Sequence, residues 1–234
     1  MHIKLNFESQ QRKRRLQKEL FAEYNNVVKI DCEVSKKWYG NSYGGFFVAP
    51  DYINKNSVVY SFGIGKDISF DKKIMKNHGC QVFAYDPTPN SIAYVKTLNN
   101  IPLFDFHAIG LADYNGDTEF FLPKIGVSGS LKNHQFLQNK EAVSVEVMTL
   151  DSIMQANGHS SIDVLKIDIE GSEYAVLEDI LRKELDVKQI CVEFHDRFFD
   201  EPPKSFEIIE KLRSTGYCIF GVSQGYEEVS FIKL

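Results

Sequence analysis

Apolar residues follow two alternating patterns along most of this chain. Short apolar runs typical of buried strands occupy residues 58–62, 81–86, 103–109, 162–170 and 188–195. Segments whose apolar positions recur at helical spacing occupy residues 67–79, 149–158, 172–185 and 203–216, and another follows Pro89. Strands that alternate with amphipathic helices predict right-handed βαβ units and a mostly parallel sheet with helices on both faces.

The C-terminal part adds a variation to this pattern. Two apolar runs, 217–223 and 227–234, flank a turn at Gly225 and predict a hairpin that contributes one antiparallel strand. Residues 113–148 predict short antiparallel strands with a polar loop at 124–140. The predicted fold class is α/β, with ligands expected at the carboxyl ends of the parallel strands.

Residues 1–50 lie outside the alternation, and we predict that they form a helical and lid extension to a main domain at 51–234. Leu16, Leu20 and Tyr24 recur every four residues and predict an amphipathic helix after a basic stretch, which we interpret as a solvated helix face. The segment 38–48 contains Gly44-Gly45 among aromatic residues and predicts a tight turn into a short strand. Its Tyr39, Tyr43, Gly44 and Gly45 are candidates for a lid.

Composition narrows the classes of protein. The 234 residues are 43% hydrophobic and 13% aromatic, which suits one large buried core and excludes disorder over the whole chain. No apolar stretch approaches the roughly 20 residues of a membrane span, and the first residues show no secretory signal. The formal net charge of -5 disfavours nucleic acid as a partner. Four cysteines, at 32, 80, 191 and 218, have no metal-site spacing, and we interpret them as reduced thiols of a cytoplasmic protein.

The first strand of the alternation ends in a glycine loop. Gly63 and Gly65 lie between that strand and the following helix, where glycine lets the backbone turn sharply and approach a ligand closely. Asp86 ends the second strand, and a carboxylate at this place can accept hydrogen bonds from both hydroxyls of a ribose. The loop and Asp86 together predict a nucleoside site.

The residues that follow the glycines limit which nucleoside fits. Ile68 occupies the third glycine position of a dinucleotide fingerprint, and Asp67 places a carboxylate where a pyrophosphate would lie. The sequence contains no GxxxxGK[ST], which excludes a P-loop. A ligand with a positive group near Asp67, such as the sulfonium of S-adenosylmethionine, fits better.

Two further strand ends gather acidic side chains. Asp168 ends the strand 162–168 and is followed by Glu170, and Glu193, His195 and Asp196 follow the next strand. A carboxylate at the end of a buried strand is costly unless it is used or paired. Two neighbours of this set have plainer interpretations. We interpret Lys166 as an ion-pair partner and Glu173 as an exposed residue in the first turn of a helix.

Six segments of the chain form a series of motifs: VVYSFGIGKDISFD, FAYDPTP, FHAIGLADYNGDTEF, VEVMTLDSI, VLKIDIEGSEYAVLEDIL and CVEFHDRF. With these segments the sequence resembles the FkbM-type methyltransferases, which are S-adenosylmethionine-dependent enzymes with the class I, Rossmann-like fold. The resemblance extends from about Trp38 to the C-terminus, and LKIDIEGSE is its most specific segment.

The resemblance implies a seven-stranded sheet with the last strand antiparallel, and it implies roles for individual residues. Gly63, Gly65 and Asp67 would line the methionine part of the cofactor, and Asp86 would bind the ribose. The adenine ring would contact His107-Ala108-Ile109. Asp168 is assigned to both the cofactor site and the catalytic group because of its place at the end of a buried strand. The chain departs from the class I pattern at Ser61, where an acid is usual.

Methyl transfer to a hydroxyl requires that its proton be removed. His195 or Asp168 would act as base, with Glu193 and Glu170 in the same catalytic group. Alternatively, Mg²⁺ bound by Asp168 with Glu193, His195 or Asp196 would lower the hydroxyl pKa.

The resemblance implies oxygen methylation, and we expect a sugar, glycan or related small molecule as acceptor; a second copy of the chain remains open as a partner. Two alternatives remain for the whole chain. One is a nicotinamide-dependent oxidoreductase, and the other is a catalytically inactive nucleoside-binding protein.

Overall fold

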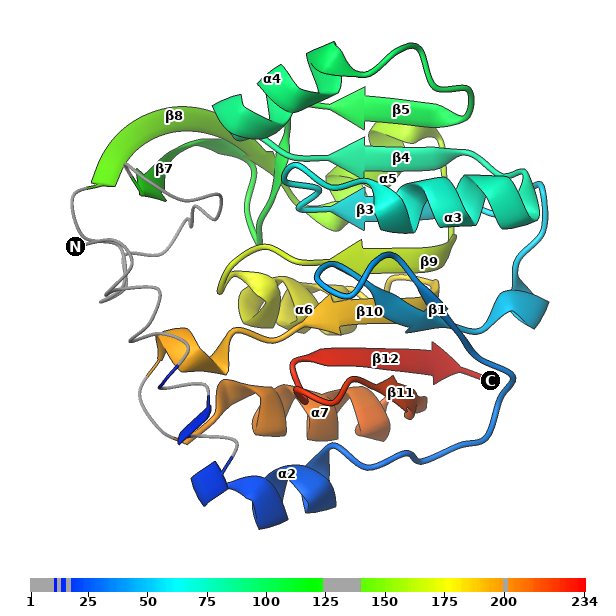
Figure 1. Cartoon of the computed structure of the whole chain (residues 1–234), viewed down its shortest axis with the longest axis vertical. Coiled ribbons are helices and arrows are strands. Elements are labelled where there is room, and N and C mark those ends of the chain that lie inside the picture. The colour runs from blue at the N-terminus through cyan, green and yellow to red at the C-terminus, as the bar shows by residue number, and fades with distance from the viewer. Residues whose placement is uncertain (1–10, 12–13, 16–17, 124–139, 200–201) are drawn as a thin grey trace.

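The central sheet has seven strands in the order β11-β12-β10-β9-β3-β4-β5 (Figure 1). A computed structural model describes residues 11, 14–15, 18–123, 140–199 and 202–234. The strands are β3 Val59–Phe62, β4 Val82–Tyr85, β5 Phe104–His107, β9 Ile162–Ile167, β10 Val187–Glu193, β11 Tyr217–Val222 and β12 Glu228–Lys233. Neighbours from β10 to β5 pair in parallel, and β12 is antiparallel to both β10 and β11. The expected α/β class and the antiparallel terminal strand are confirmed.

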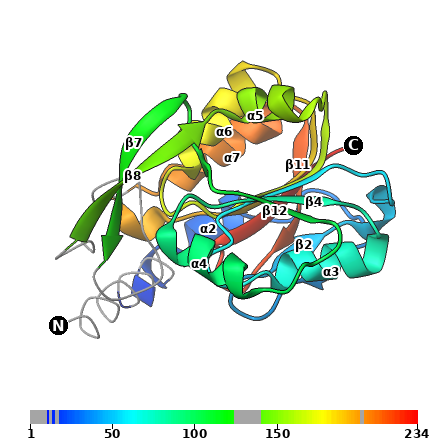
Figure 2. The same cartoon turned by 90° about the horizontal axis from the view of Figure 1, so that it is seen from above.

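Helices cover both faces of this sheet, as the alternation predicted. They are α3 Ser69–His78, α4 Pro89–Thr97, α5 Leu150–Asn157, α6 Glu173–Arg182 and α7 Lys204–Ser214. Figure 2 shows α5, α6 and α7 on one side of the sheet, and α3 and α4 on the other. The chain runs outward from β3 toward β5 and then returns to β9 beside β3, so the strand order reverses between β3 and β9. The carboxyl ends of these two strands are therefore the expected ligand site.

A smaller sheet projects beside the carboxyl ends of the parallel strands (Figure 1). It consists of β6 Gly110–Leu111, β7 Gly116–Pro123 and β8 Lys140–Met148, in the order β6-β8-β7. β7 and β8 pair antiparallel, as the pattern of 113–148 predicted. The predicted polar loop lies outside the described residues except for its last position.

The described part of the N-terminal segment packs on the main body. α2 Phe21–Val27 places Tyr24 in the core, where its hydroxyl donates to Asp196. β1 Lys37–Tyr39 and β2 Phe46–Val48 form an antiparallel pair, followed by a short 3-10 turn, Pro50–Tyr52. The backbone of Ala49 exchanges two hydrogen bonds with the buried amide of Gln189 in β10. The described N-terminal residues therefore pack against the central sheet. Leu16, the first residue of the predicted helical pattern, lies outside the described residues.

The cysteines correct one sequence-based interpretation. Cys32 and Cys218 form a disulfide that joins the N-terminal segment to β11, with 6.0 Å between their Cα atoms. Cys80 and Cys191 are free and buried, as expected. The bonded pair lies 186 positions apart, so no spacing rule reveals it. The expected cytoplasmic location loses its basis, because it rested on reduced thiols. Among the described residues, every helix is too short or too polar to cross a bilayer.

Candidate active site

The glycine loop lies at the turn from β3 into α3, as predicted. Gly63 and Gly65 both have positive φ, 75° and 53°. A Cβ on Gly63 would overlap the backbone carbonyl of Asp168, whereas Gly65 has open space around it. Glycine at 63 is therefore required by the close approach of the chain that leaves β9. The amide of Gly63 also donates to the carbonyl of Tyr85, at 2.9 Å, which ties the loop to β4.

Asp86 closes this loop from the end of β4. It is 5% exposed, and one carboxylate oxygen accepts the Gly65 amide at 2.9 Å. The other oxygen accepts the amide and the hydroxyl of Thr88 at 2.9 and 2.6 Å. Asp86 thus faces the same cleft as the two glycines, and its position is fixed by three hydrogen bonds.

The loop and Asp86 border a pocket of about 300 Å³. Its described lining comprises Asn41, Tyr43, Gly44, Phe62, Gly63, Ile64, Gly65, Lys66, Asp67, Tyr85, Asp86, Pro87, Thr88, Gly110, Leu111, Phe120, Lys166, Asp168, Ile169 and Glu170. A pocket of this size with a few converging polar groups is typical of a small-molecule site. The two glycines, Asp67, Asp86 and Asp168 therefore meet in one place, and their contacts with a cofactor remain a prediction.

The residues predicted to contact adenine lie next to the pocket lining. His107, Ala108 and Ile109 are not among the described residues that line the pocket, whereas Gly110, Leu111 and Phe120 are. The ring of His107 stacks on Tyr85, its register partner on β4, with 4.8 Å between the ring centroids. Tyr85 itself lines the pocket, and a contact between residues 107–109 and adenine stays a prediction.

The predicted lid is shorter than expected, and its anchor was missed. Of the four lid candidates, Tyr43 and Gly44 line the pocket. Tyr39 is buried with its hydroxyl 2.8 Å from His78, and a Cβ on Gly45 would overlap Trp38.

Asn41 holds the turn over the glycine loop. Its side-chain Nδ2 donates to Asp67 at 2.6 Å, and its side-chain Oδ1 accepts hydrogen bonds from the backbone amides of Tyr43 and Gly44. An asparagine shortly before Gly44-Gly45 is typical of a turn, and this pattern could have identified Asn41 from the sequence.

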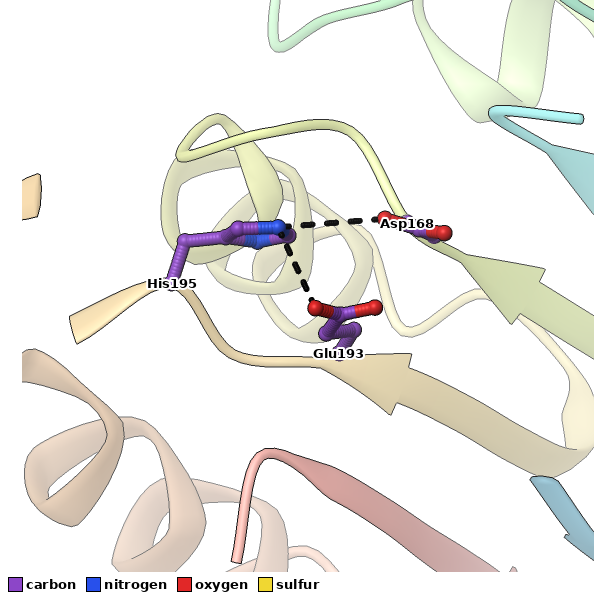
Figure 3. Close-up of side chains that lie close together, drawn as sticks. All are labelled: Asp168, Glu193 and His195. Carbon is purple, nitrogen blue, oxygen red and sulfur yellow. Dashed lines mark ion pairs between the residues drawn. The ribbon is translucent and has the colours of Figure 1, made fainter. Parts of the chain in front are cut away.

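The acidic residues after β9 and β10 converge on His195, as predicted (Figure 3). Nε2 of His195 lies 3.3 Å from Glu170, 3.5 Å from Glu193 and 3.8 Å from Asp168. The imidazole is fully buried, whereas Asp168 and Glu170 reach the pocket. The two carboxylates are thus the members of this group that can touch a bound molecule directly.

Glu173 belongs to the same cluster, contrary to the sequence-based interpretation. It is fully buried, and it accepts the backbone amides of His195 at 2.9 Å and Gly171 at 2.8 Å. The same carboxylate lies 3.2 Å from Nδ1 of His195. The helix-start position suggested exposure, but the turn after Glu170 directs this side chain inward.

The charges around His195 set its protonation state. Burial alone would lower the pKa of His195, but the charges of Glu170 and Glu173 raise it to about 10. Burial and the charge of Asp168 raise the pKa of Glu193 well above its usual range. In this environment the imidazole is protonated at neutral pH, which disfavours His195 as a general base.

Two other members of the predicted set have structural roles. Asp196 accepts hydrogen bonds from Ser205, Tyr174 and Tyr24, so it is directed away from the cluster. Lys166 lies 3.7 Å from Asp168 and donates to the carbonyl of Gly63 at 3.0 Å, which confirms its interpretation as an ion-pair partner.

The backbone at Glu170 is unusual for a residue with a side chain. Its φ is +52°, in the left-handed region, and Gly171 follows at +99°. Residues other than glycine rarely adopt this region, and those that do gather at functional sites. The conformation brings Glu170 to the pocket and turns the chain toward Glu173.

The reversal of strand order at β3 and β9, the inserted antiparallel β12 and the glycine loop closed by Asp86 define a methyltransferase fold of the class I, Rossmann-like type. Residues 52–219 match the family described as "Methyltransferase FkbM domain". The chain therefore belongs to the FkbM methyltransferase family, as the resemblance implied.

Relatives and solved structures extend this comparison. The chain is 28% identical over 152 residues to human "Probable methyltransferase-like protein 24" and 26% identical over 173 residues to its Rattus norvegicus counterpart. These alignments span 64% and 73% of this chain but 36% and 42% of the relatives.

Two archaeal fibrillarins are similar solved structures. The Methanococcus jannaschii pre-rRNA processing protein has a TM-score of 0.45 and 13% identity, covering 89% of this chain and 86% of its own. The Aeropyrum pernix protein, solved with bound S-adenosyl-L-methionine, has a TM-score of 0.42 and 9% identity, covering 88% of this chain and 85% of its own.

Proposed function

We propose that this protein transfers a methyl group from S-adenosylmethionine to a hydroxyl oxygen. The observation that supports this most directly is the pocket itself, where the glycine loop and Asp86 adjoin Asp67, Asp168 and Glu170. Asp86 offers the ribose a carboxylate that is already oriented. The three further carboxylates give the pocket a negative wall, which favours a sulfonium and disfavours a pyrophosphate.

The residues that line the pocket would have different roles in methyl transfer. S-adenosylmethionine supplies the methyl group on a positively charged sulfur. The acceptor oxygen forms its bond to the methyl carbon as the carbon–sulfur bond breaks, and its proton passes to a carboxylate. Asp168 and Glu170 are the candidates for this proton, because both reach the pocket. Lys166 fixes the position of Asp168 through an ion pair and that of the Gly63 carbonyl through a hydrogen bond.

The acceptor that we propose is a hydroxyl of a sugar, a glycan or a related small molecule. The family resemblance motivates this class, and the lid supports it. Tyr43 presents an aromatic ring at the pocket, which suits the apolar face of a sugar, and Asn41 holds the turn that carries this ring. The curated relatives are considerably longer than this chain, so their remaining parts contribute nothing to this assignment.

Ligand binding tests the cofactor half of the proposal. S-adenosylhomocysteine at 100 times its Kd should raise the unfolding free energy by about 2.7 kcal/mol, and NAD should leave it unchanged. Asp86→Asn should weaken S-adenosylhomocysteine binding by about 10- to 150-fold in calorimetry, because a charged acceptor is lost.

Asp105→Asn is a matched control, since this exposed carboxylate on β5 lies outside the pocket lining. Stabilisation by NAD alone would support the oxidoreductase alternative. Methyl transfer to a panel of glycosides can be detected by mass spectrometry. If the protein binds S-adenosylhomocysteine but methylates none of these glycosides, the result would support an inactive binding protein.

A further inference from the structure

The buried face of the acidic cluster has a feature that methyl transfer does not explain. We propose that Asp168, Glu193 and His195, with Glu170 as a fourth ligand, form a site for a divalent first-row metal ion such as Mn²⁺. The ligand atoms of the first three residues all lie within 4.8 Å of one another. The function of such an ion rests on the proposed methyl transfer, but its binding does not.

The distances fit a metal site that lacks its ion. Around an ion with ligands at about 2.1 Å, adjacent donor atoms lie roughly 3.0–3.4 Å apart and opposite ones about 4.2 Å apart. Nε2 of His195 lies 3.3–3.8 Å from the oxygens of Glu170, Glu193 and Asp168. The distance to Glu170 matches that of adjacent donors, and the distances to Glu193 and Asp168 lie between the adjacent and the opposite values. The close-up view shows His195 and Glu193, both from the end of β10, facing Asp168 at the end of β9 (Figure 3).

Nε2 of the imidazole faces Glu170, Glu193 and Asp168 without a hydrogen bond to any of the three among the described residues. Within the described part of the chain, Nε2 makes no hydrogen bond, although its residue is fully buried. A structural ion pair would direct this nitrogen at one oxygen with good hydrogen-bond geometry. Here it points between several oxygens, which is the arrangement that a shared ligand produces.

The opposite nitrogen of the imidazole, Nδ1, is held by a carboxylate. Nδ1 lies 3.2 Å from Glu173, and this carboxylate is itself fixed by the amides of Gly171 and His195. Histidines that bind metals commonly donate their second N–H to a carboxylate, which fixes the tautomer and the ring orientation. The Nδ1–H donated to Glu173 leaves the lone pair of Nε2 free for a metal.

The charge balance of the cluster also favours a cation. The acidic groups that face one another here outnumber the basic ones within the described residues. The acids are Asp168, Glu170, Glu173, Glu193 and Glu227, and the bases are Lys166, Arg197 and, when protonated, His195. A divalent ion would replace the proton of His195 and offset the remaining excess.

A neighbouring group of acids is a poorer candidate. Glu193, Glu227 and Glu228 also have ligand atoms close together. However, the guanidinium of Arg197 lies 2.9 Å from Glu227 and 3.7 Å from Glu193, so a positive charge already lies on that side of Glu193. The ion is therefore placed on the His195 side of Glu193.

The donor set and its position indicate which metal and what use. Carboxylates suit Mg²⁺ and Mn²⁺, and imidazole suits the transition metals, so Mn²⁺ satisfies both kinds of donor. Asp168 and Glu170 border the pocket, so an ion held by them has an open side toward an acceptor. Asp168 and Glu170 would then act as ligands instead of proton acceptors. The ion would lower the pKa of a bound hydroxyl, whose proton would pass to bulk water, because the positive charge stabilises the deprotonated oxygen.

Direct binding of Mn²⁺ to the full chain, stripped with EDTA and dialysed, tests this proposal. We expect one ion per chain by calorimetry, with affinity at least 10-fold lower in Glu193→Gln and His195→Gln. Glu173→Gln should lower the affinity by about 10- to 100-fold through the supporting hydrogen bond. Asp105→Asn, which alters an exposed carboxylate beside His107, should bind Mn²⁺ as the unaltered protein does.

A spectroscopic readout keeps the test decisive if a variant fails to fold. Electron spin-echo spectra of Mn²⁺ bound to the unaltered protein should show coupling to an imidazole nitrogen. Absence of Mn²⁺ and Zn²⁺ binding at millimolar concentration, or binding without nitrogen coupling, would overturn the site. Mn²⁺ binding without any S-adenosylhomocysteine binding would refute the proposed methyl transfer and leave the metal site standing.

Discussion

The polar groups at the ends of β3 and β4 border the pocket directly, whereas the group after β9 and β10 reaches it through Asp168 and Glu170, and the two groups are held in different ways. Asp86 accepts three hydrogen bonds, two of them from backbone amides, so its orientation is fixed without a ligand. His195 is surrounded by Glu170, Glu193 and Asp168 and bonds to none of them through Nε2 within the described residues.

This difference indicates what each half requires from a partner. The β3–β4 half is a rigid frame whose geometry should persist with or without cofactor, because local backbone bonds define it. The β9–β10 half concentrates like charges in a buried volume, which is costly unless a proton or a cation offsets them. The stability of the protein should therefore respond to pH and to cations mainly through the β9–β10 half.

The largest effect should come from Glu173→Ala. This change removes the acceptor of two backbone amides and leaves the charged His195 without its buried partner, so we expect a loss of about 3–5 kcal/mol in denaturant unfolding. Glu178→Ala on the same helix removes an exposed carboxylate paired with Lys211 and should cost at most about 1 kcal/mol. Equal losses in the two variants would show that the cluster is no more demanding than the surface.

A smaller effect should separate the two glycines of the loop. Gly63→Ala adds a side chain that overlaps the Asp168 carbonyl at positive φ, so it should destabilise the protein by about 2 kcal/mol or more. Gly65→Ala meets only the positive φ and should cost about 1 kcal/mol. Thermal unfolding of both variants measures the difference, and a reversed order would contradict the close approach of β9 to the loop.

The most gradual effect is a dependence of stability on pH in the metal-free protein. The pKa of His195 is raised to about 10, so its contribution is complete below the unfolded value of about 6.5 and disappears as the pH rises through 10. The raised pKa of Glu193 acts in the same direction.

The unfolding free energy should therefore fall between about pH 6.5 and 10, with at most about 1.4 kcal/mol per pH unit for each proton. Urea titrations should show a shallower fall for His195→Gln, and an equal slope in both proteins would assign the effect to other groups.

Local pattern was sufficient for most of the fold. The alternation of apolar runs and amphipathic helices located every strand and helix of the main sheet, because each element buries one face or both. It did not reveal that Cys32 reaches Cys218, since that contact depends on where the N-terminal segment packs. The lid had the same difficulty: its anchor, Asn41, acts through a bond to Asp67 on another element.

The part of the site that lies at strand ends could be predicted from the sequence. Asp168, Glu193 and His195 were expected to meet, because parallel neighbours end at one edge of the sheet. The burial of Glu173 was not, because a helix-start glutamate is usually exposed and only the turn at Glu170 and Gly171 directs it inward. The stacking of His107 on Tyr85 was not predicted either, because it depends on the register between two strands.

The left-handed backbone at Glu170 has a consequence for anyone who redesigns this protein. Glycine adopts that conformation freely, and a side chain there costs about 1–2 kcal/mol. A redesign that scores backbone conformation alone would therefore choose glycine at 170 and remove a carboxylate from the pocket wall. At this position backbone strain and function are in opposition, because Glu170→Gly should relieve the left-handed backbone and also remove a partner of His195.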